Sequence, residues 1–146
     1  MISLDEKTAN DIKLEAEKAY PNECCGFIFG HMNNNDKSVE FIYPCENTSD
    51  VGEQYHRFTI TPELMLKAEL TAQKLGIGII GFYHSHPDCE AVPSEYDRTH
   101  ALPIYNYIIV SVKNGKSDAF NSWELDEKTD YKQFSKVTVN IGKGDV

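Results

Sequence analysis

The run from Ile77 to Tyr83 (IGIIGFY) constrains the fold more than any other stretch, because it is almost entirely apolar or glycine. A strand with one face in water alternates apolar and polar residues, whereas a strand covered on both faces does not. The run therefore predicts a central strand with other elements packed on both sides of its sheet. His84 follows directly, so a site is expected at the carboxyl end of this strand.

Two segments carry apolar residues at helical spacing and can supply these covering layers. In the first, apolar and small side chains recur every three or four residues, at Ala9, Ile12, Ala16, Ala19 and Tyr20. Ser3 and Glu6 have the spacing of a capping box for this helix, and Pro21 ends it. The second helix is predicted to begin at Thr61 as N-cap, with a proline in the first turn, and to stop at Gly76. Its apolar stripe consists of Leu64, Met65, Ala68, Ala72 and Leu75.

The other β-rich runs predict hairpins and edge strands around the central strand. Residues 26–32 and 39–43 flank an Asn-Asn-Asn-Asp turn, and residues 104–112 and 117–125 flank a turn with an Asn-Gly pair. Further strands are predicted at 55–60 and, as one edge strand, at 131–141, with 142–146 as a tail. Residues 94–101 can form one or two helical turns before Pro103. These elements predict an α/β fold with a mixed β-sheet flanked by helices.

Length and composition indicate a single domain over residues 1–146, without a linker or an internal repeat. The chain has 40% hydrophobic and 25% charged residues, close to the averages of globular proteins. Its formal net charge of −9 argues against nucleic-acid binding, because an acidic surface repels phosphate groups. No stretch approaches the roughly 20 apolar residues that span a bilayer, and the first residues turn acidic too early for a signal peptide. We therefore expect no membrane partner and a cytoplasmic location.

The four cysteines, Cys24, Cys25, Cys45 and Cys89, are predicted to be reduced thiols. A chain of this length does not need disulfides, and it shows no export signal. Zinc binding is a competing use, but there is no Cys-x-x-Cys pair, and the adjacent Cys24 and Cys25 lack the usual chelating spacing. Burial as small apolar residues is the favoured interpretation. Cys89 is interpreted as a loop residue, with a zinc ligand in a rearranged site or an oxidisable thiol as alternatives.

Two histidines two residues apart, His84 and His86, occupy the end of the predicted central strand. The period of a strand sends both imidazoles to the same side, so they can share a ligand. Hydrogen-bonded structural histidines are the alternative, and the pair alone does not decide between them. A carboxylate from Asp97, folded back from the next helical turn, would complete a zinc site with the fourth position open, as hydrolytic zinc requires.

Ser94 and Asp97 also have the spacing of a helix capping pair, which is common at any helix start. The two interpretations are compatible, because the N-terminus of a helix also stabilises negative charge. A hydrolytic site further needs a base, and Glu23 stands between the first helix and the first strand. Its position alone is that of an ordinary surface glutamate, and only the family resemblance below gives it this role.

Taken together, these residues resemble the signature of the JAMM (MPN-plus) zinc metalloproteases. The matching pieces are Glu23, the His84-x-His86-Pro87 segment and Ser94-x-x-Asp97, in this order and with seven residues between His86 and Ser94. The resemblance implies the family's compact α/β fold, similar to that of cytidine deaminases, over about residues 3–125. Residues 126–146 would then form a C-terminal extension.

The resemblance also implies a role for each residue. His84, His86 and Asp97 would bind one zinc ion, which can bring the pKa of a bound water to about 7. Glu23 would take a proton from the attacking water and later donate it to the leaving amine. Ser94 would polarise the scissile carbonyl and stabilise the oxyanion. The implied reaction is hydrolysis of an amide or isopeptide bond without a covalent intermediate.

The chain between Phe58 and Tyr107 has no room for the insertions with which larger family members grip ubiquitin chains. It is more similar to the stand-alone prokaryotic members, some of which process ubiquitin-like sulfur-carrier proteins after a C-terminal Gly-Gly. Residues without side chains can thread a narrow cleft where bulkier residues clash. The resemblance therefore implies a ubiquitin-like or sulfur-carrier protein with a Gly-Gly tail as substrate.

Two other hypotheses compete with a zinc hydrolase. Related MPN domains that lack the ligands act as non-catalytic interaction scaffolds, although the intact motif counts against this role. A zinc deaminase would need His-x-Glu with Pro-Cys-x-x-Cys, which the chain lacks. His100 shares a helical face with Asp97 and is interpreted as an exposed histidine, with a supporting or substitute ligand as the alternative. Trp123, Tyr105 and Tyr107 are interpreted as packing groups rather than a binding platform.

Overall fold

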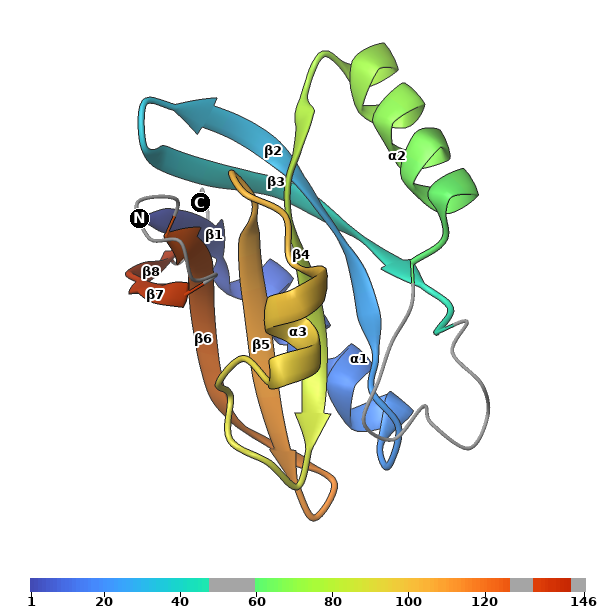
Figure 1. Ribbon diagram of the computed structural model, residues 1–146, viewed down its shortest axis with the longest axis vertical. Coiled ribbons are helices and arrows are strands. Elements are labelled where there is room, and N and C mark those ends of the chain that lie inside the picture. The colour runs from blue at the N-terminus through green and yellow to red at the C-terminus, as the bar shows by residue number, and fades with distance from the viewer. Residues whose placement is uncertain (48–59, 127–132, 143–146) are drawn as a thin grey trace.

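Helices cover both faces of one mixed β-sheet in the computed structural model, which describes residues 1–47, 60–126 and 133–142 (Figure 1). The predicted α/β fold class, a mixed sheet flanked by helices, is confirmed. In chain order the elements are β1 (Ile2–Asp5), α1 (Glu6–Ala19), β2 (Cys25–Asn33), β3 (Asp36–Cys45), α2 (Pro62–Leu75), β4 (Gly78–Pro87), α3 (Glu95–His100), β5 (Asn106–Lys113), β6 (Lys116–Asp126), β7 (Gln133–Val137) and β8 (Val139–Gly142).

The strand order across the sheet, within the described ranges, is β7-β6-β5-β4-β2-β3-β1-β8. Both predicted hairpins, β2–β3 and β5–β6, are present and antiparallel. Their turns use left-handed backbone at Asn34 (φ 59°), Asn114 (φ 52°) and Gly115 (φ 83°), which asparagine and glycine tolerate best. The central strand β4 pairs antiparallel with β2 and parallel with β5.

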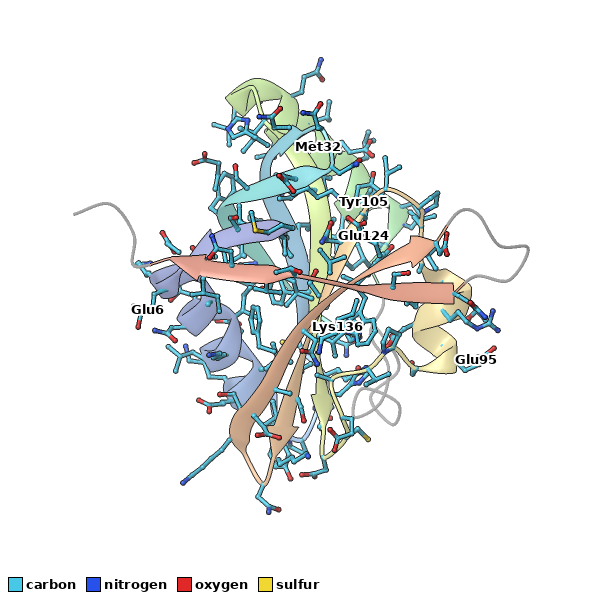
Figure 2. The ribbon with its side chains drawn as sticks, turned by 90° about the vertical axis from the view of Figure 1, so that its left-hand side faces the viewer. Glu6, Met32, Glu95, Tyr105, Glu124 and Lys136 are labelled. Atoms are coloured by element: carbon cyan, nitrogen blue, oxygen red, sulfur yellow. The ribbon has the colours of Figure 1, made fainter. Side chains whose placement is uncertain are left out.

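The strand predicted for residues 131–141 is in fact two strands that pair with opposite ends of the sheet. β7 pairs with β6, whereas β8 pairs with β1, and only Thr138 separates them. The two ends of the sheet must therefore curve toward each other. Figure 2 shows these last strands running across the molecule between the α1 side, marked by Glu6, and the α3 side, marked by Glu95.

The predicted start of the first helix was wrong. Residues 2–5 form strand β1, and Asp5 rather than Ser3 caps α1 by accepting a hydrogen bond from the Thr8 amide at 2.7 Å. β1 has only four residues, too few for a clear alternation. It forms because β3 and β8 offer parallel partners that also bury Ile2 and Leu4.

Helix α2 has the predicted limits. Thr61 caps it through Leu64 N at 3.2 Å, and Gly76 ends it in the left-handed conformation (φ 70°). The strand predicted at 55–60 lies outside the described residues, apart from Ile60, which precedes α2 and is not in a strand. The predicted tail lies outside them too, apart from Gly142, which ends β8. No helix in the described part of the chain has the length and hydrophobicity needed to cross a membrane.

Two hydrophobic clusters pack on the two faces of the sheet. On one face α1 buries Ile12 and Ala16 against Ile28 and Ile108. On the other face α2 packs with the same strands through a second set of side chains that includes Ala68, Ala72, Phe27, Phe29, Phe82 and Tyr107. The central strand is therefore covered on both sides, as its composition predicts.

Strand β4 continues farther than predicted. Its apolar run was predicted over Ile77 to Tyr83 with the two histidines at its end, and the strand runs on to Pro87 because β5 pairs with it in register from Gly81 to Pro87. His84 lies opposite Ile109 and His86 opposite Ser111. His84 is thus paired with β2 on one side and β5 on the other, and His86 is paired with β5. A paired strand, rather than a loop, holds both histidines.

Candidate active site

The two histidines of β4 form the centre of the candidate site. His84 and His86 are 1% and 8% exposed, and their Nε2 atoms lie 3.2 Å apart. Their side chains alternate with Ser85, as the period of a strand requires. The expectation that both imidazoles face one side is therefore confirmed by the distance between them.

Asp97 brings a carboxylate to both imidazoles from the neighbouring helix. Its Oδ2 lies 3.1 Å from His84 Nε2 and 3.0 Å from His86 Nε2. Helix α3 orients Asp97 through a capping box, in which Asp97 N donates to Ser94 Oγ at 3.0 Å and Ser94 N donates to Asp97 Oδ2 at 2.9 Å. The capping interpretation of Ser94 and Asp97 is confirmed, and the same geometry points Asp97 at the histidines.

The backbone selects the tautomer of His86. Its Nδ1 lies 2.9 Å from the carbonyl oxygen of Glu90, and because a carbonyl only accepts, Nδ1 must carry the hydrogen. A neutral His86 then presents the lone pair of Nε2 toward His84 and Asp97. This is the arrangement that metal-binding histidines commonly show.

Burial and charge together set the protonation of this cluster. Burial lowers the pKa of His84, although the Asp97 carboxylate opposes it. Burial acts in the same direction on His86, but the hydrogen bond and the charge of Asp97 outweigh it and raise the pKa of His86. Burial would raise the pKa of Asp97, yet the two imidazoles and Ser94 N hold it well below its usual range. The donor set therefore contains an ionised carboxylate.

Glu23 lies beside the histidines although it is distant in sequence. It is 3% exposed, its Oε1 lies 3.9 Å from His86 Nε2, and its Oε2 has no hydrogen-bond partner among the described residues. Burial raises the pKa of Glu23 to about 8, against the opposing effect of His86. The carboxyl group can therefore take up and release a proton near neutral pH.

Backbone contacts that no sequence pattern indicates hold the segment that carries Glu23. Cys24 N donates to the buried Ser85 Oγ at 2.8 Å, and Ser85 N donates to Cys24 O at 3.2 Å. Asn47 Nδ2 donates to Glu23 O at 3.2 Å. Ser85 stands between the two histidines in sequence, which is the only hint of its role that the sequence contains.

The donor atoms fit a tetrahedral metal ion. Ligand atoms at roughly 2.1 Å from zinc lie about 3.4 Å from one another, close to the 3.0–3.2 Å that separate His84 Nε2, His86 Nε2 and Asp97 Oδ2. Glu23, His84 and His86 also offer donor atoms within 4.8 Å of one another. Asp97 is the better third ligand, because its oxygen is nearer to both imidazoles than Glu23 is to His86.

The structure also gives the surroundings of the cysteines, His100 and Trp123. Cys24 and Cys25 are buried and all four cysteines are free, while Cys89 is an exposed loop residue. His100 is exposed and stacks on Tyr96, with ring centroids 4.0 Å apart. Trp123 packs near the site, where its Nε1 donates to Ala91 O at 3.1 Å.

Two cavities are lined by residues of the centre. One, of about 330 Å³, is lined by His84 and Asp97 together with apolar side chains that include Pro62, Met65, Phe82, Leu102 and Tyr107. The other, of about 720 Å³, is lined by Glu23, His86, Ser94 and the loop before Ser94. The residues of the centre are therefore divided between two cavity linings, with His84 and Asp97 in one and Glu23 and His86 in the other.

This fold and donor set define a class of small α/β domains in which two histidines of a central strand meet an aspartate of the following helix. Residues 5–126 match the model of the prokaryotic homologs of the JAB domain, and the chain belongs to this family. The predicted resemblance to the small prokaryotic members of the JAMM family is confirmed.

Several individual proteins are similar to this chain. A desampylase of Haloferax volcanii is 32% identical over 108 residues, which are 73% of this chain and 73% of that protein. A desampylase of Pyrococcus furiosus is 32% identical over 108 residues, 73% of this chain and 69% of that protein. The solution structure of a protein from Desulfitobacterium hafniense has a TM-score of 0.83 and 27% sequence identity, and the match covers 99% of this chain and 94% of that one.

Proposed function

We propose that this protein is a zinc-dependent metallopeptidase or isopeptidase that cleaves the amide bond after the C-terminal Gly-Gly of a ubiquitin-like or sulfur-carrier protein. The observation that carries the proposal is the convergence of His84, His86 and Asp97 beside a buried carboxyl group, Glu23. The similarity to the desampylases supports isopeptidase activity on ubiquitin-like modifiers.

In this proposal His84, His86 and Asp97 hold the metal ion. Zinc supplies Lewis acidity, which polarises a carbonyl group and makes water more acidic. Hydrolysis adds the oxygen of water to the acyl carbon, breaks the C–N bond and yields a carboxylate and an amine. Every remaining task falls to side chains of the protein.

Glu23 moves the proton. Its carboxylate accepts a proton from the attacking water and donates it to the nitrogen as the C–N bond breaks. A pKa of about 8 suits both steps of this transfer, because both the protonated and the ionised form of the carboxyl group are accessible near neutral pH. The Oε2 atom, which lacks a partner among the described residues, is the natural proton carrier.

Ser94 stabilises the oxygen that becomes negative. Its Oγ accepts the hydrogen bond from Asp97 N, which leaves the hydroxyl hydrogen available as a donor. Donation to the carbonyl oxygen is worth roughly 10²–10³ in turnover in comparable sites. The capping role and the catalytic role of Ser94 are therefore compatible.

Zinc stoichiometry tests the metal site directly. We expect about one zinc per chain by elemental analysis, and loss of that zinc in His86→Ala and Asp97→Ala. His31→Ala is the matched control, because His31 is an exposed strand histidine paired with Glu40 at 3.4 Å, and it should keep the zinc. Absence of zinc from the wild-type protein, even after incubation with the metal, would favour the non-catalytic scaffold.

Cleavage tests the reaction. A fusion in which Gly-Gly ends a ubiquitin-like domain should be hydrolysed by the zinc-loaded protein and not after chelation of the metal. Glu23→Gln should retain zinc and lose roughly 10²–10⁴ in turnover, because the proton carrier is gone. Undiminished turnover in that variant would remove Glu23 from the mechanism.

A further inference from the structure

The cavity on the Glu23 side of the centre has more carboxyl groups in its walls than the other cavity. It is formed by Pro21 and Glu23 before β2 and by the loop from Pro87 to Ser94 after β4. His86 lines this cavity, whereas His84 and Asp97 line the smaller one. Both cavities expose mainly apolar surface, and they differ in their carboxyl groups: Asp97 in the smaller one, and Glu23, Asp88 and Glu90 in the larger one.

The position of Glu23 indicates which side of the centre each half of the substrate occupies. Glu23 is 3% exposed, lines only the larger of these two cavities, and has an Oε2 without a partner among the described residues. A carboxyl group that protonates the leaving nitrogen must be next to that nitrogen. The amine half of the substrate therefore belongs on the Glu23 side, and the acyl half belongs in the smaller cavity.

The walls of the Glu23-side cavity carry negative charge. Apart from His86 and the thiol of Cys89, its ionisable lining residues are Glu23, Asp88 and Glu90, with no lysine or arginine among them. Lys113 contacts Glu90 at 2.8 Å and also Asp118 at 3.4 Å. Lys113 thus divides its charge between Glu90 and Asp118, which lies outside the cavity lining, whereas Asp88 contacts Tyr20 OH and Asn114 N and has no cationic partner among the described residues. The lining therefore keeps an excess of negative charge.

The loop that forms this wall is fixed before any substrate binds. Ser111 Oγ donates to Cys89 O at 2.5 Å, and Ala91 O accepts from Trp123 Nε1 and from Asn121 Nδ2 at 3.1 and 3.2 Å. Tyr20 OH donates to Asp88 Oδ2 at 2.6 Å and so ties the two walls together. A preorganised wall loses little entropy on binding, which favours selectivity.

We infer that this cavity receives the amine half of the substrate and selects a positively charged segment, such as a target lysine flanked by further basic residues. The inference rests on the proposed function, because it assumes that an amide bond is cleaved at this centre. It adds which side each half occupies and which targets are preferred.

Matched substrates test the charge preference. Each shares one acyl half ending in Gly-Gly, joined to the side-chain amine of a lysine that is flanked by either two lysines or two glutamates. We expect a higher kcat/KM for the lysine-flanked substrate, and a smaller difference at high salt because exposed charges are screened. Equal values at low salt would overturn the inference.

Reversing the charge of one residue of the cavity wall tests whether this wall causes the preference for the lysine-flanked substrate. Glu90 is 73% exposed, so Glu90→Lys should lower the ratio of the two kcat/KM values by roughly two- to five-fold, the scale of exposed charge pairs. Glu40→Lys is the matched control, because Glu40 is an exposed residue of β3 that pairs with His31. An equal effect of both substitutions would mean that net charge, and not this cavity, sets the preference.

Cys89 permits a test without catalysis. It is the exposed cysteine of the four and lines this cavity, so an environment-sensitive dye can be attached there. The lysine-flanked peptide, added as the free amine product, should change the fluorescence, and the glutamate-flanked peptide should not. Cys89→Ser, treated with the same reagent, shows whether any signal comes from another site.

The two readouts separate the possible failures. A response of the dye without cleavage of either substrate would leave the cavity assignment standing and reject the proposed hydrolase. Cleavage without charge preference and without a dye response would reject the cavity assignment and keep the hydrolase. Absence of both cleavage and dye response would reject the cavity assignment as well.

Discussion

At the scale of single residues, the close approach of β4 and β5 depends on Gly81. A Cβ atom at this position would lie 2.2 Å from Asn106 O, a backbone atom of the paired strand. A side chain can rotate away from such a clash, but a paired backbone cannot. Gly81 thus lets β5 lie against the strand that carries the histidines.

We expect Gly81→Ala to destabilise the fold by about 2–3 kcal/mol, the usual cost of forcing extra volume into a packed position. Gly78→Ala is the control on the same strand, because nothing lies within 4 Å of its added Cβ. It should leave stability unchanged or raise it slightly, since alanine loses less backbone entropy than glycine. Urea unfolding monitored by circular dichroism distinguishes the two, and equal midpoints would contradict the clash.

The cysteines should differ in reactivity in the folded protein. Burial raises the pKa of Cys24 to about 12 and that of Cys45 to about 11, so little thiolate forms at neutral pH. At pH 8 iodoacetamide should modify the exposed Cys89 first and leave the buried Cys24 and Cys25 intact until unfolding. Modification of the half-buried Cys45 should accelerate as the pH rises toward 10, because its thiolate fraction increases. Peptide mapping measures each site, and modification of Cys24 as fast as Cys89 would refute this order.

At the scale of elements, α2 illustrates how local capping contributes to the site. Thr61 and Met65 line the smaller cavity, and Thr61 also caps the helix. The N-cap bond satisfies one of the amide groups that the first turn leaves without a helical partner. The start of α2 is therefore defined by the same residue that borders the site.

Thr61→Ala should destabilise the protein by about 1 kcal/mol through loss of this cap. Thr71→Ala is the matched control in the middle of the same helix, where the threonine is exposed and donates only to Lys67 O at 2.9 Å. It should be neutral or stabilising by up to about 0.5 kcal/mol, because alanine is the better helix former. Thermal unfolding of both variants is the measurement, and equal losses would show that the cap is not the cause.

At the scale of the whole molecule, Lys37 joins parts of the sheet that are not neighbours. It belongs to β3, yet its Nζ donates to Asn106 Oδ1 of β5 at 2.5 Å and to Glu124 Oε1 of β6 at 3.0 Å. It also donates to Ile104 O at 2.5 Å, where isoleucine adopts an unfavourable positive φ of 71°. These contacts require the curvature of the sheet and hold the segment between α3 and β5.

Lys37→Met should lower the stability of the fold by about 2–4 kcal/mol. This is less than the cost of breaking a fully buried ion pair, because the Lys37 side chain is 4% exposed but that of Glu124 is 37% exposed. The loss leaves three acceptors without their donor. Lys7→Met is the control, since Lys7 is an exposed lysine paired with Asp11 on α1, and it should change stability by less than about 0.5 kcal/mol. Denaturant unfolding compares the two variants. Unchanged stability in Lys37→Met would refute the claim that the Lys37 contacts stabilise the fold.

Prediction from sequence was most successful for contacts made within a few residues. The limits of α2 follow from Thr61 and Gly76, and the capping box of α3 follows from Ser94 and Asp97. It failed where a short segment took its structure from distant partners. β1 was missed because its four residues are stabilised by β3 and β8, and the last strand was not recognised as two for the same reason.

Strand period predicted from the sequence that the two histidines face one side, and the spacing of Ser94 and Asp97 predicted a helix cap, because both are local properties. The grouping of these residues with Glu23 came from the resemblance to a family. Only the tertiary structure decided that Glu23 reaches to 3.9 Å from His86, and that His84 and Asp97 line one cavity while Glu23 and His86 line another. These arrangements depend on pairing between β2 and β4 and on hydrogen bonds such as that of Cys24 with Ser85. Such contacts join residues about 60 positions apart, and no local pattern specifies which distant partner a segment will meet.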